Sequence, residues 1–184
     1  RPIIALVDTP AAYPGVESEE RGVAQAIAYN LREMAMLTVP IIVVVTGEGG
    51  SGGALGLAIG DRILMQEYAI YSVIPPEGCA AILWRDASQK AAAAEALKIS
   101  AKQLLDFGII DEIVPEPKGA AHADPAVAAE MLDDALGQEF DRLINSSDDV
   151  DVRLANRYEK FRRMGNFGLE GLENVEAGPS VEDK

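Results

Sequence analysis

Two unbroken apolar runs stand out early in the chain, at residues 3–7 and 41–45. Runs of this length without polar positions are typical of strands that are buried on both faces of a parallel sheet. Between them, after a loop that extends to about residue 18, apolar residues recur every three or four positions, which predicts a helix ending near residue 37. The apolar face of this helix consists of Val23, Ile27, Leu31 and Met34.

After residue 54 the apolar runs become shorter and alternate between helical and extended patterns. Ser100 and Gln103 form a capping box at the start of one further helix, and Gly108 is typical of the position just beyond a helix end. Strands that alternate with helices in this way indicate an α/β fold. The other expected elements are helices over 55–59, 79–84 and 90–97, and strands over 63–65, 69–73 and 109–114.

From residue 125 the pattern changes to two longer helices, predicted over 125–144 and 149–164. The first has an apolar face made of Val127, Met131, Leu132, Leu136 and Phe140. The second has a basic face, for which solvent is the default neighbour and a partner subunit the alternative; it consists of Arg153, Arg157, Lys160, Arg162 and Arg163. The predicted organisation is a core over 1–124, a helical extension over 125–165 and a disordered tail over 166–184.

The chain is acidic, because 16 Lys and Arg residues face 30 Asp and Glu residues, giving a net charge of −14 over 184 residues. The excess is uneven, with −3 over residues 1–105 and −11 over residues 106–184. Binding to nucleic acid or to an anionic membrane surface depends on clustered basic side chains. The charge therefore argues against both kinds of partner.

Cys79 is the single cysteine, which excludes an intramolecular disulfide and a cysteine-rich zinc site within this chain. No apolar run approaches the roughly 20 residues that a membrane-spanning helix needs, and the first residues do not form a secretory signal. We therefore expect a cytoplasmic protein. Because the sequence opens directly in a predicted strand without an initiator methionine, we also expect the N-terminal part of its domain to be missing.

Five glycines lie within residues 47–53, which we call the glycine segment, between a predicted strand and a predicted helix. A Walker phosphate loop is excluded because Ala54 and Leu55 stand where Lys and Ser or Thr are required, and a dinucleotide fingerprint matches only weakly. The segment also has the form of a nucleophile elbow, in which Ser51 would be the nucleophile and His122 the base.

A third interpretation of the glycine segment is an oxyanion hole without a side-chain nucleophile. Glycines allow a substrate oxygen to approach the backbone closely, and the N–H groups of Gly52 and Gly53 would then stabilise developing negative charge on an enolate or ureido oxygen. The alternative without a catalytic role is that these glycines only permit a tight turn and close packing of the following helix. The residues alone leave these alternatives open.

Eight short motifs, in order along residues 1–165, resemble the carboxyltransferase α subunit of bacterial-type acetyl-CoA carboxylase. They are DTPAAYPG at 8–15, EERG at 19–22, NLREM at 30–34, GEGGSGGA at 47–54, YSVI at 71–74, PEGCA at 76–80, ILW at 82–84 and PEPKGAAH at 115–122. The family is longer at its N-terminus, so the chain resembles the C-terminal part of a family member.

The resemblance implies a crotonase-like fold, a spiral of β-β-α units with C-terminal helices, and an active site between subunits. It also implies the reaction: the carboxyl group of carboxybiotin, tethered to a biotin carboxyl carrier protein, moves to acetyl-CoA and forms malonyl-CoA for fatty acid synthesis. The implied assembly is α2β2, in which a zinc-bearing β subunit stabilises the acetyl-CoA enolate and the α subunit stabilises the ureido oxygen of biotin. The biotin anion left by the departing carboxyl group can accept the methyl proton, so no side-chain base is needed.

Carried over to this sequence, the resemblance makes Gly52 and Gly53 the backbone donors to the biotin ureido oxygen. The loop after the first strand matches a segment that supplies a further amide in crotonase-like folds, although Ala11 stands where the family usually has glycine. The implied substrate-binding residues are Ala11, Ala12, Tyr13, Gly49, Gly50, Glu77 and Gly78.

Two other functions remain as alternatives. A free-standing acyl-CoA hydratase or isomerase of the same fold would need an acidic pair near the glycine segment, where only Glu48 is local. A non-catalytic assembly module would bind a partner without turnover. Among the remaining residues, we expect Cys79 to be buried, Trp84 to lie in the core or an interface, and His122 to be structural or interfacial.

Overall fold

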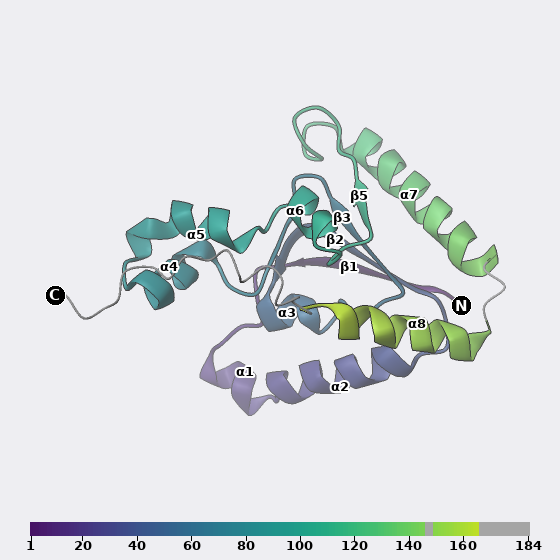
Figure 1. The fold of residues 1–184 in the computed structure, drawn as a ribbon, viewed down its shortest axis with the longest axis horizontal. Coiled ribbons are helices and arrows are strands. Elements are labelled where there is room, and N and C mark those ends of the chain that lie inside the picture. The colour runs from purple at the N-terminus through teal and green to yellow at the C-terminus, as the bar shows by residue number, and fades with distance from the viewer. Residues whose placement is uncertain (146–148, 166–184) are drawn as a thin grey trace, which may run out of the picture.

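The computed structural model describes residues 1–145 and 149–165 as an α/β fold around a parallel sheet (Figure 1). The sheet order is β1 (Ile3–Thr9), β2 (Ile41–Gly50), β3 (Arg62–Gln66) and β5 (Glu112–Val114), and the short strand β4 (Ile70–Ser72) pairs with the second half of β2. Both long apolar runs are confirmed as strands. The predicted disordered tail over 166–184 lies outside the described residues.

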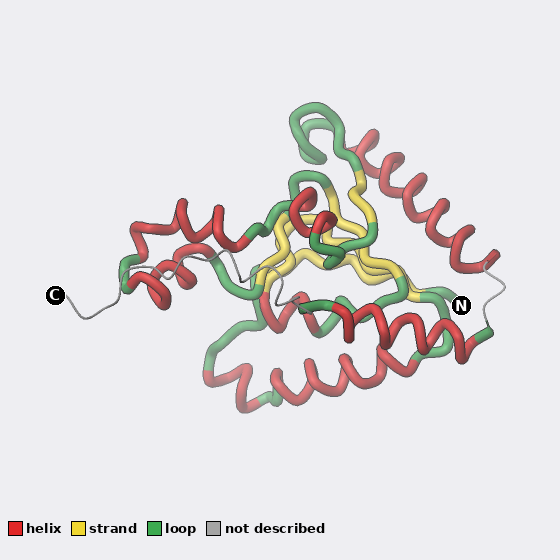
Figure 2. Tube along the Cα trace, viewed as in Figure 1, coloured by secondary structure: helices red, strands yellow, loops and turns green. Residues whose placement is uncertain are grey.

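The central strand β2 is buried on both faces, which explains its five consecutive apolar residues. Ile41, Val43 and Val45 face a large core cluster that also contains residues of α3 (Ser51–Leu55) and α6 (Ala101–Asp106). Ile42 and Val44 face the opposite side, where α7 (Pro125–Asn145) covers them. Figure 2 shows the strands enclosed by helices in this way.

Four further helices agree with the predicted pattern, apart from some of their ends: α2 (Val23–Met36), α4 (Pro76–Trp84), α5 (Lys90–Leu97) and α8 (Val150–Arg163). Two elements were not predicted separately, α1 (Val16–Glu20), which begins within the predicted loop, and the 3₁₀ turn η1 (Ala87–Gln89). Gly22 separates α1 from α2 with a φ of +77°, a left-handed conformation that glycine adopts at little cost. The predicted apolar face of α2 is confirmed, because Val23, Ile27, Leu31 and Met34 are its half-buried apolar residues.

Three predicted boundaries near the site are wrong. The strand over 41–45 continues to Gly50, and the helix expected over 55–59 is instead Ser51–Leu55, so residues 56–59 are not helical and the glycine segment is half strand and half helix rather than a loop. The last strand begins at Glu112 instead of residue 109, because the N–H groups of Ile109 and Ile110 both donate to the Leu104 carbonyl and close the end of α6. The capping box of Ser100 and the helix end at Gly108 are confirmed.

Helices α4 and α5 form a lobe that projects from the sheet at the left of Figure 1. Cys79 is buried, as predicted, in a small separate cluster with Ala80 and Ala93. Trp84 and its neighbour Leu83 are exposed, so the core alternative for Trp84 is wrong and the interface alternative stays a prediction. The lobe therefore packs on itself, with its largest apolar side chains outside its core.

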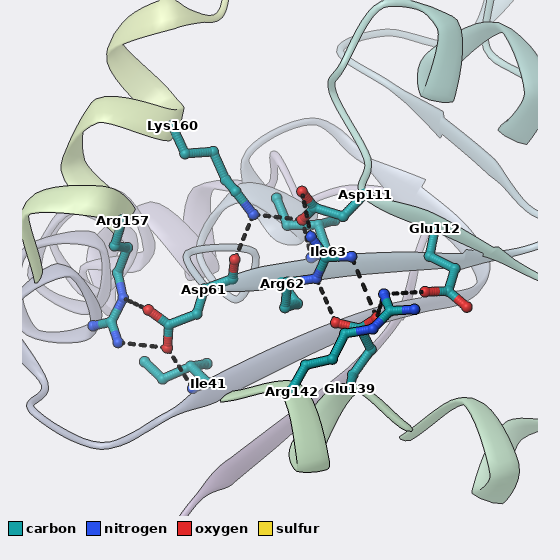
Figure 3. Close-up of polar contacts among 10 residues, drawn as sticks. All are labelled: Ile41, Asp61, Arg62, Ile63, Asp111, Glu112, Glu139, Arg142, Arg157 and Lys160. Carbon is teal, nitrogen blue, oxygen red and sulfur yellow. Dashed lines mark hydrogen bonds and ion pairs between the residues drawn. The ribbon is translucent and has the colours of Figure 1, made fainter. Parts of the chain in front are cut away.

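The basic face of α8 is the largest departure from the sequence-based expectation, because part of it is turned inward (Figure 3). The Arg157 residue is only 2 % exposed, and its guanidinium donates to both oxygens of the Asp61 carboxylate at 2.9 and 2.8 Å. It also donates to the carbonyls of Met34, in the last turn of α2, and of Leu37, the residue just after α2. Lys160 pairs with Asp111. We call Asp61, Asp111, Arg157 and Lys160 the α8 anchor.

Each of the two aspartates of the α8 anchor stands directly before a strand, Asp61 before β3 and Asp111 before β5. The Asp61 carboxylate accepts the N–H of Ile41 at 2.7 Å, and the Asp111 carboxylate accepts the N–H of Ile63 at 2.7 Å. Burial lowers the pKa of Lys160, although its ion pair with Asp111 works in the opposite direction. The anchor thus ties α8 directly to the N-terminal ends of β2 and β3.

A second polar cluster holds α7 against the sheet. The Glu139 carboxylate is fully buried, pairs with Arg62, and accepts from Arg142 at 2.6 Å (Figure 3). Both helices of the predicted extension over 125–165 therefore pack on the same sheet as residues 1–124. The division of the chain at residue 124 stays a prediction.

Removing the charge of Glu112 is expected to reduce the pH dependence of folding stability. Burial, and then the neighbouring Glu139 carboxylate, raise the pKa of Glu112 above its usual 4.5. Between that value and the folded pKa the native state binds more protons than the unfolded state, so stability falls as the pH rises through this window. Urea unfolding of Glu112→Gln from pH 4 to pH 8 should show a smaller fall than the unchanged chain. An identical pH profile would contradict this expectation, and Glu130→Gln, at an exposed position on α7, is the control.

Within the described residues, no helix combines the length and apolar character that crossing a bilayer requires.

Candidate functional site

The glycine segment lies at the C-terminal end of β2, between two parallel neighbours. Gly49 is in register with Thr9 of β1 on one side and with Tyr71 of β4 on the other. The Asp8 carboxylate accepts the N–H of Glu48 at 3.0 Å and so holds the start of the segment. Three strand ends therefore converge where ligands commonly bind in open parallel sheets.

The loop that follows β1 packs directly on the glycine segment. A Cβ atom on Gly50 would lie 1.6 Å from the Pro10 carbonyl oxygen, and one on Gly53 would lie 2.6 Å from backbone atoms of Ala11 and Ala12. Glycine is thus required at both positions for backbone packing. Backbone packing alone therefore explains why glycine stands at positions 50 and 53, without any contact to a ligand.

Gly52 and Gly53 lie in the first turn of α3, where N–H groups have no acceptor within the helix. Within residues 1–145 and 149–165, neither amide finds another protein acceptor. Gly52 has more space than Gly53, because a Cβ there would meet only the Ile27 side chain at 3.4 Å. Both residues are half-buried. Neither amide is therefore used by a protein acceptor in the described part of the chain, and Gly53 lies closer than Gly52 to neighbouring backbone.

Two pockets flank the glycine segment and meet at Ser72 of β4. The first, which we call the acidic pocket, has a volume of about 280 Å³ and is lined in part by Gly49, Gly50 and the carboxylate residues Glu48 and Glu77. The second, which we call the apolar pocket, has a volume of about 490 Å³. Its lining contains no charged residue and consists of Ser51, Gly52, Leu55, Tyr71, Ser72, Val73, Leu97, Leu104 and Ile109.

The structure brings only some of the sequence-predicted residues to these pockets. Gly49, Gly50 and Glu77 line the acidic pocket and Gly52 lines the apolar pocket. Ala11 and Ala12 lie behind the segment, against Gly53. The others point elsewhere: Tyr13 is 70 % exposed and folds over Gly15, while Gly78 packs against Ile74.

Glu77 lies in the first turn of α4 and pairs with Lys90 of α5 at 3.3 Å. A hydrogen bond from its own backbone N–H, and then the Lys90 ammonium, hold the pKa of Glu77 below its usual value. Glu77 is therefore ionised at neutral pH, which makes it a poor proton donor.

Tyr71 is the pocket residue that the sequence-based reasoning missed. It was part of the YSVI motif at 71–74, but no role followed from that match. Its ring packs on Gly49, where a Cβ atom would lie 2.8 Å from Tyr71 Cδ2, and burial raises the pKa of its hydroxyl. Only the pairing of β4 with β2 shows that Tyr71 lies beside Gly49, so the sequence alone did not identify this contact.

One feature of a nucleophile elbow is present, because Ser51 lies at the turn from β2 to α3 with a φ of +47°, the strained backbone that such an elbow needs. The side-chain contacts of an elbow are missing from the described part of the chain. Neither the Ser51 hydroxyl nor the ring of His122 makes a hydrogen bond within that part, and His122 is exposed and absent from the lining of either pocket. A base within reach of the nucleophile is the feature such a site needs.

In residues 1–145 and 149–165, no group of three or more His, Cys, Asp or Glu side chains is placed to hold a metal ion.

Solved structures share this fold. A Pseudomonas malonate decarboxylase hetero-tetramer in complex with malonate aligns with a TM-score of 0.67 at 20% identity, covering 88% of this chain and 64% of the other. Transcarboxylase 12S with methylmalonyl-coenzyme A bound aligns with a TM-score of 0.57 at 25% identity, covering 71% of this chain and 27% of the other. The α/β fold with its parallel sheet is the crotonase-like fold expected from the sequence.

Curated relatives are much closer in sequence. The acetyl-coenzyme A carboxylase carboxyl transferase subunit alpha of Geobacter metallireducens is 60% identical over 166 residues, covering 90% of this chain and 52% of the relative. The protein of the same name from Thermosynechococcus vestitus is 59% identical over 168 residues, covering 90% and 51%. The chain thus spans about half the length of these relatives. Residues 1–165 also match the family described as acetyl co-enzyme A carboxylase carboxyltransferase-like, and the chain belongs to that family.

Proposed function

We propose that this chain is the part of an acetyl-CoA carboxylase α subunit that binds the carboxyl donor. In the proposed reaction the carboxyl group of carboxybiotin moves to acetyl-CoA and gives malonyl-CoA, at the start of fatty acid synthesis. The names of the curated relatives support the reaction class, because these relatives are 59–60% identical to this chain over 90% of its length.

One observation of the structure carries the proposal: two amides without protein acceptors, on Gly52 and Gly53, beside an uncharged pocket. Carboxybiotin supplies the carboxyl group and, once this has left, an anion able to accept the methyl proton of acetyl-CoA. The ring system of biotin is uncharged and largely apolar, and its one carbonyl oxygen becomes more negative as the carboxyl group leaves. The apolar pocket fits such a ring, and the two amides fit such an oxygen.

The contribution of this chain is then electrostatic and positional. The Gly52 and Gly53 N–H groups bind the developing negative charge, which typically contributes about 10²–10³ in rate per donor. The chain holds these donors in place, since the loop of Ala11 and Ala12 packs on Gly53 and the Asp8 carboxylate holds Glu48. We further propose that Gly49, Gly50 and Glu77 line the approach of the acyl substrate. Tyr13 and Gly78 would contribute by supporting Gly15 and Ile74 rather than by direct contact.

Partners are part of the same proposal. A biotin carboxyl carrier protein would deliver the donor, and a zinc-bearing β subunit in an α2β2 assembly would bind acetyl-CoA and stabilise its enolate. The shortage of cations in both pockets supports this division, because the lining of each lacks Lys and Arg and the phosphates of coenzyme A need cationic partners. The proposed location is the cytoplasm.

Reconstitution tests the proposed function. The full-length chain, combined with a zinc-bearing β subunit and a carboxylated carrier protein, should convert radiolabelled acetyl-CoA to malonyl-CoA. Omission of either partner should abolish the product. Complex formation without turnover would favour the non-catalytic assembly module, whereas hydration of an enoyl-CoA by the chain alone would favour the hydratase alternative.

Replacing Ser51 by alanine should lower the rate of carboxyl transfer by less than about tenfold, because the proposed chemistry uses backbone amides and not this hydroxyl. Loss of a true serine nucleophile typically costs a factor of about 10⁶. Steady-state kinetics of the reconstituted complex distinguish these outcomes. A loss on the scale of a missing nucleophile would revive the hydrolase interpretation of Ser51 and His122.

A further inference from the structure

Tyr71 occupies a position between the glycine segment and the apolar pocket. Its backbone is held from both sides, in register with Gly49 of β2 and by a hydrogen bond from its N–H to the Ile99 carbonyl at 3.1 Å. Its ring lies over the face of Gly49, where a Cβ atom would collide with it at 2.8 Å. The ring therefore has little freedom to move, and the position of the hydroxyl follows from the position of the ring.

The hydroxyl of Tyr71 lacks a partner within the described part of the chain, where it makes no hydrogen bond to a protein group. Fully buried side-chain polar atoms in that part all have a partner, so the Tyr71 hydroxyl must be open to solvent or to a ligand. Tyr71 lines the apolar pocket, and burial raises the pKa of its hydroxyl. At neutral pH it is consequently a protonated hydrogen-bond donor at the edge of an uncharged pocket.

The apolar pocket restricts the class of ligand that this donor can meet. Its volume of about 490 Å³ suits a small molecule, and its lining contains no Lys, Arg, Asp or Glu. A phosphate would lose its hydration there without gaining a cation. An uncharged bicyclic ring that carries hydrogen-bond acceptors suits the pocket, and the ureido and thioether ring system of biotin has this character.

We propose that the Tyr71 hydroxyl is a specificity-determining donor that orients the biotin ring system in the apolar pocket, next to the Gly52 amide. This inference rests on the proposed function and adds a side-chain contact to the two backbone donors. The tyrosine ring would form one wall of the pocket, and its hydroxyl would select a ligand with an acceptor at that wall. A purely apolar ring of the same size would gain nothing from it.

The test uses Tyr71→Phe in the full-length chain assembled with its β subunit. Phenylalanine keeps the ring over Gly49 and removes only the hydroxyl. Tyr68→Phe is the matched control, because Tyr68 lies two residues before β4, is 60 % exposed, and lines neither pocket. Binding of D-biotin methyl ester, an uncharged probe, is measured by ligand-detected NMR titration. KM for the biotin donor and KM for acetyl-CoA are measured separately.

Tyr71→Phe should weaken binding of the probe and raise KM for the biotin donor by about three- to tenfold, as expected for the loss of one neutral hydrogen bond. KM for acetyl-CoA and all values for Tyr68→Phe should stay unchanged. A merely structural role would leave both KM values unchanged, because the ring is retained. Unchanged probe binding, or no binding to the parent complex, would overturn the role of Tyr71. Failure of carboxyl transfer in the parent complex, with probe binding still sensitive to Tyr71→Phe, would instead overturn the proposed reaction and leave the site in place.

Discussion

Proline at position 52 is expected to lower kcat for carboxyl transfer about 10²–10³-fold, because it removes one of the two amides that bind the developing oxyanion. Gly52 lies in the first turn of α3, where an N–H group has no acceptor within the helix, so proline removes no helical hydrogen bond. Proline also restricts the backbone of the residue before it, and Ser51 has a φ of +47°, so the fold of the variant must be measured as well. The measurement is the steady-state rate of malonyl-CoA formation by the reconstituted complex.

Gly52→Ala is the matched control for this experiment. Both substitutions add a Cβ atom that meets only the Ile27 side chain, at 3.4 Å, but alanine keeps the N–H group. The alanine variant should therefore retain most of the activity, and circular dichroism should show that both variants fold. Equal losses in the two variants would mean that space, not the amide, matters at position 52.

The same substitution at Gly53 would be a poorer test, although the sequence singles out both glycines. A Cβ atom on Gly53 would lie 2.6 Å from backbone atoms of Ala11 and Ala12. Proline there would displace the neighbouring loop as well as remove an amide, so a loss of activity would have two causes. The structure thus separates two positions that look equivalent in the sequence.

Replacement of Arg157 by methionine is expected to lower the free energy of unfolding by about 3–5 kcal/mol, because it leaves the buried Asp61 carboxylate without its cation. The substitution also removes the donors to the Met34 and Leu37 carbonyls at the end of α2. Methionine is similar to arginine in length and helix propensity, so α8 itself should still form. Urea unfolding followed by circular dichroism measures the change.

Arg163→Met is the control for Arg157→Met. Arg163 belongs to the same helix and the same predicted basic face, but it is exposed and makes no ion pair with another described residue. Its replacement should change the free energy of unfolding by less than about 0.5 kcal/mol. Similar effects of the two substitutions would show that the α8 anchor contributes little beyond a solvated charge.

Local sequence patterns predicted the parts of the fold that depend on neighbours along the chain. The run at 41–45 predicted a strand buried on both faces, and its side chains do alternate between two core clusters. The capping box at Ser100 and the helix end at Gly108 were equally readable, because capping is a short-range interaction. The first turn of α3 was misplaced, since glycine has low propensity for both helix and strand and leaves no local signal.

The sequence by itself thus determined the fold class and the family and singled out the glycine segment, because these depend on patterns that lie within a few residues of each other; the role of the Gly52 and Gly53 amides stays a prediction. Only the tertiary structure decided the rest. It turned Arg157 inward onto Asp61, 96 positions away, and it placed Tyr71 over Gly49 through the pairing of β4 with β2. The physical reason is the same in both cases: a charge or a ring takes its role from the partner that folding brings to it, and the local pattern records neither the partner nor its distance.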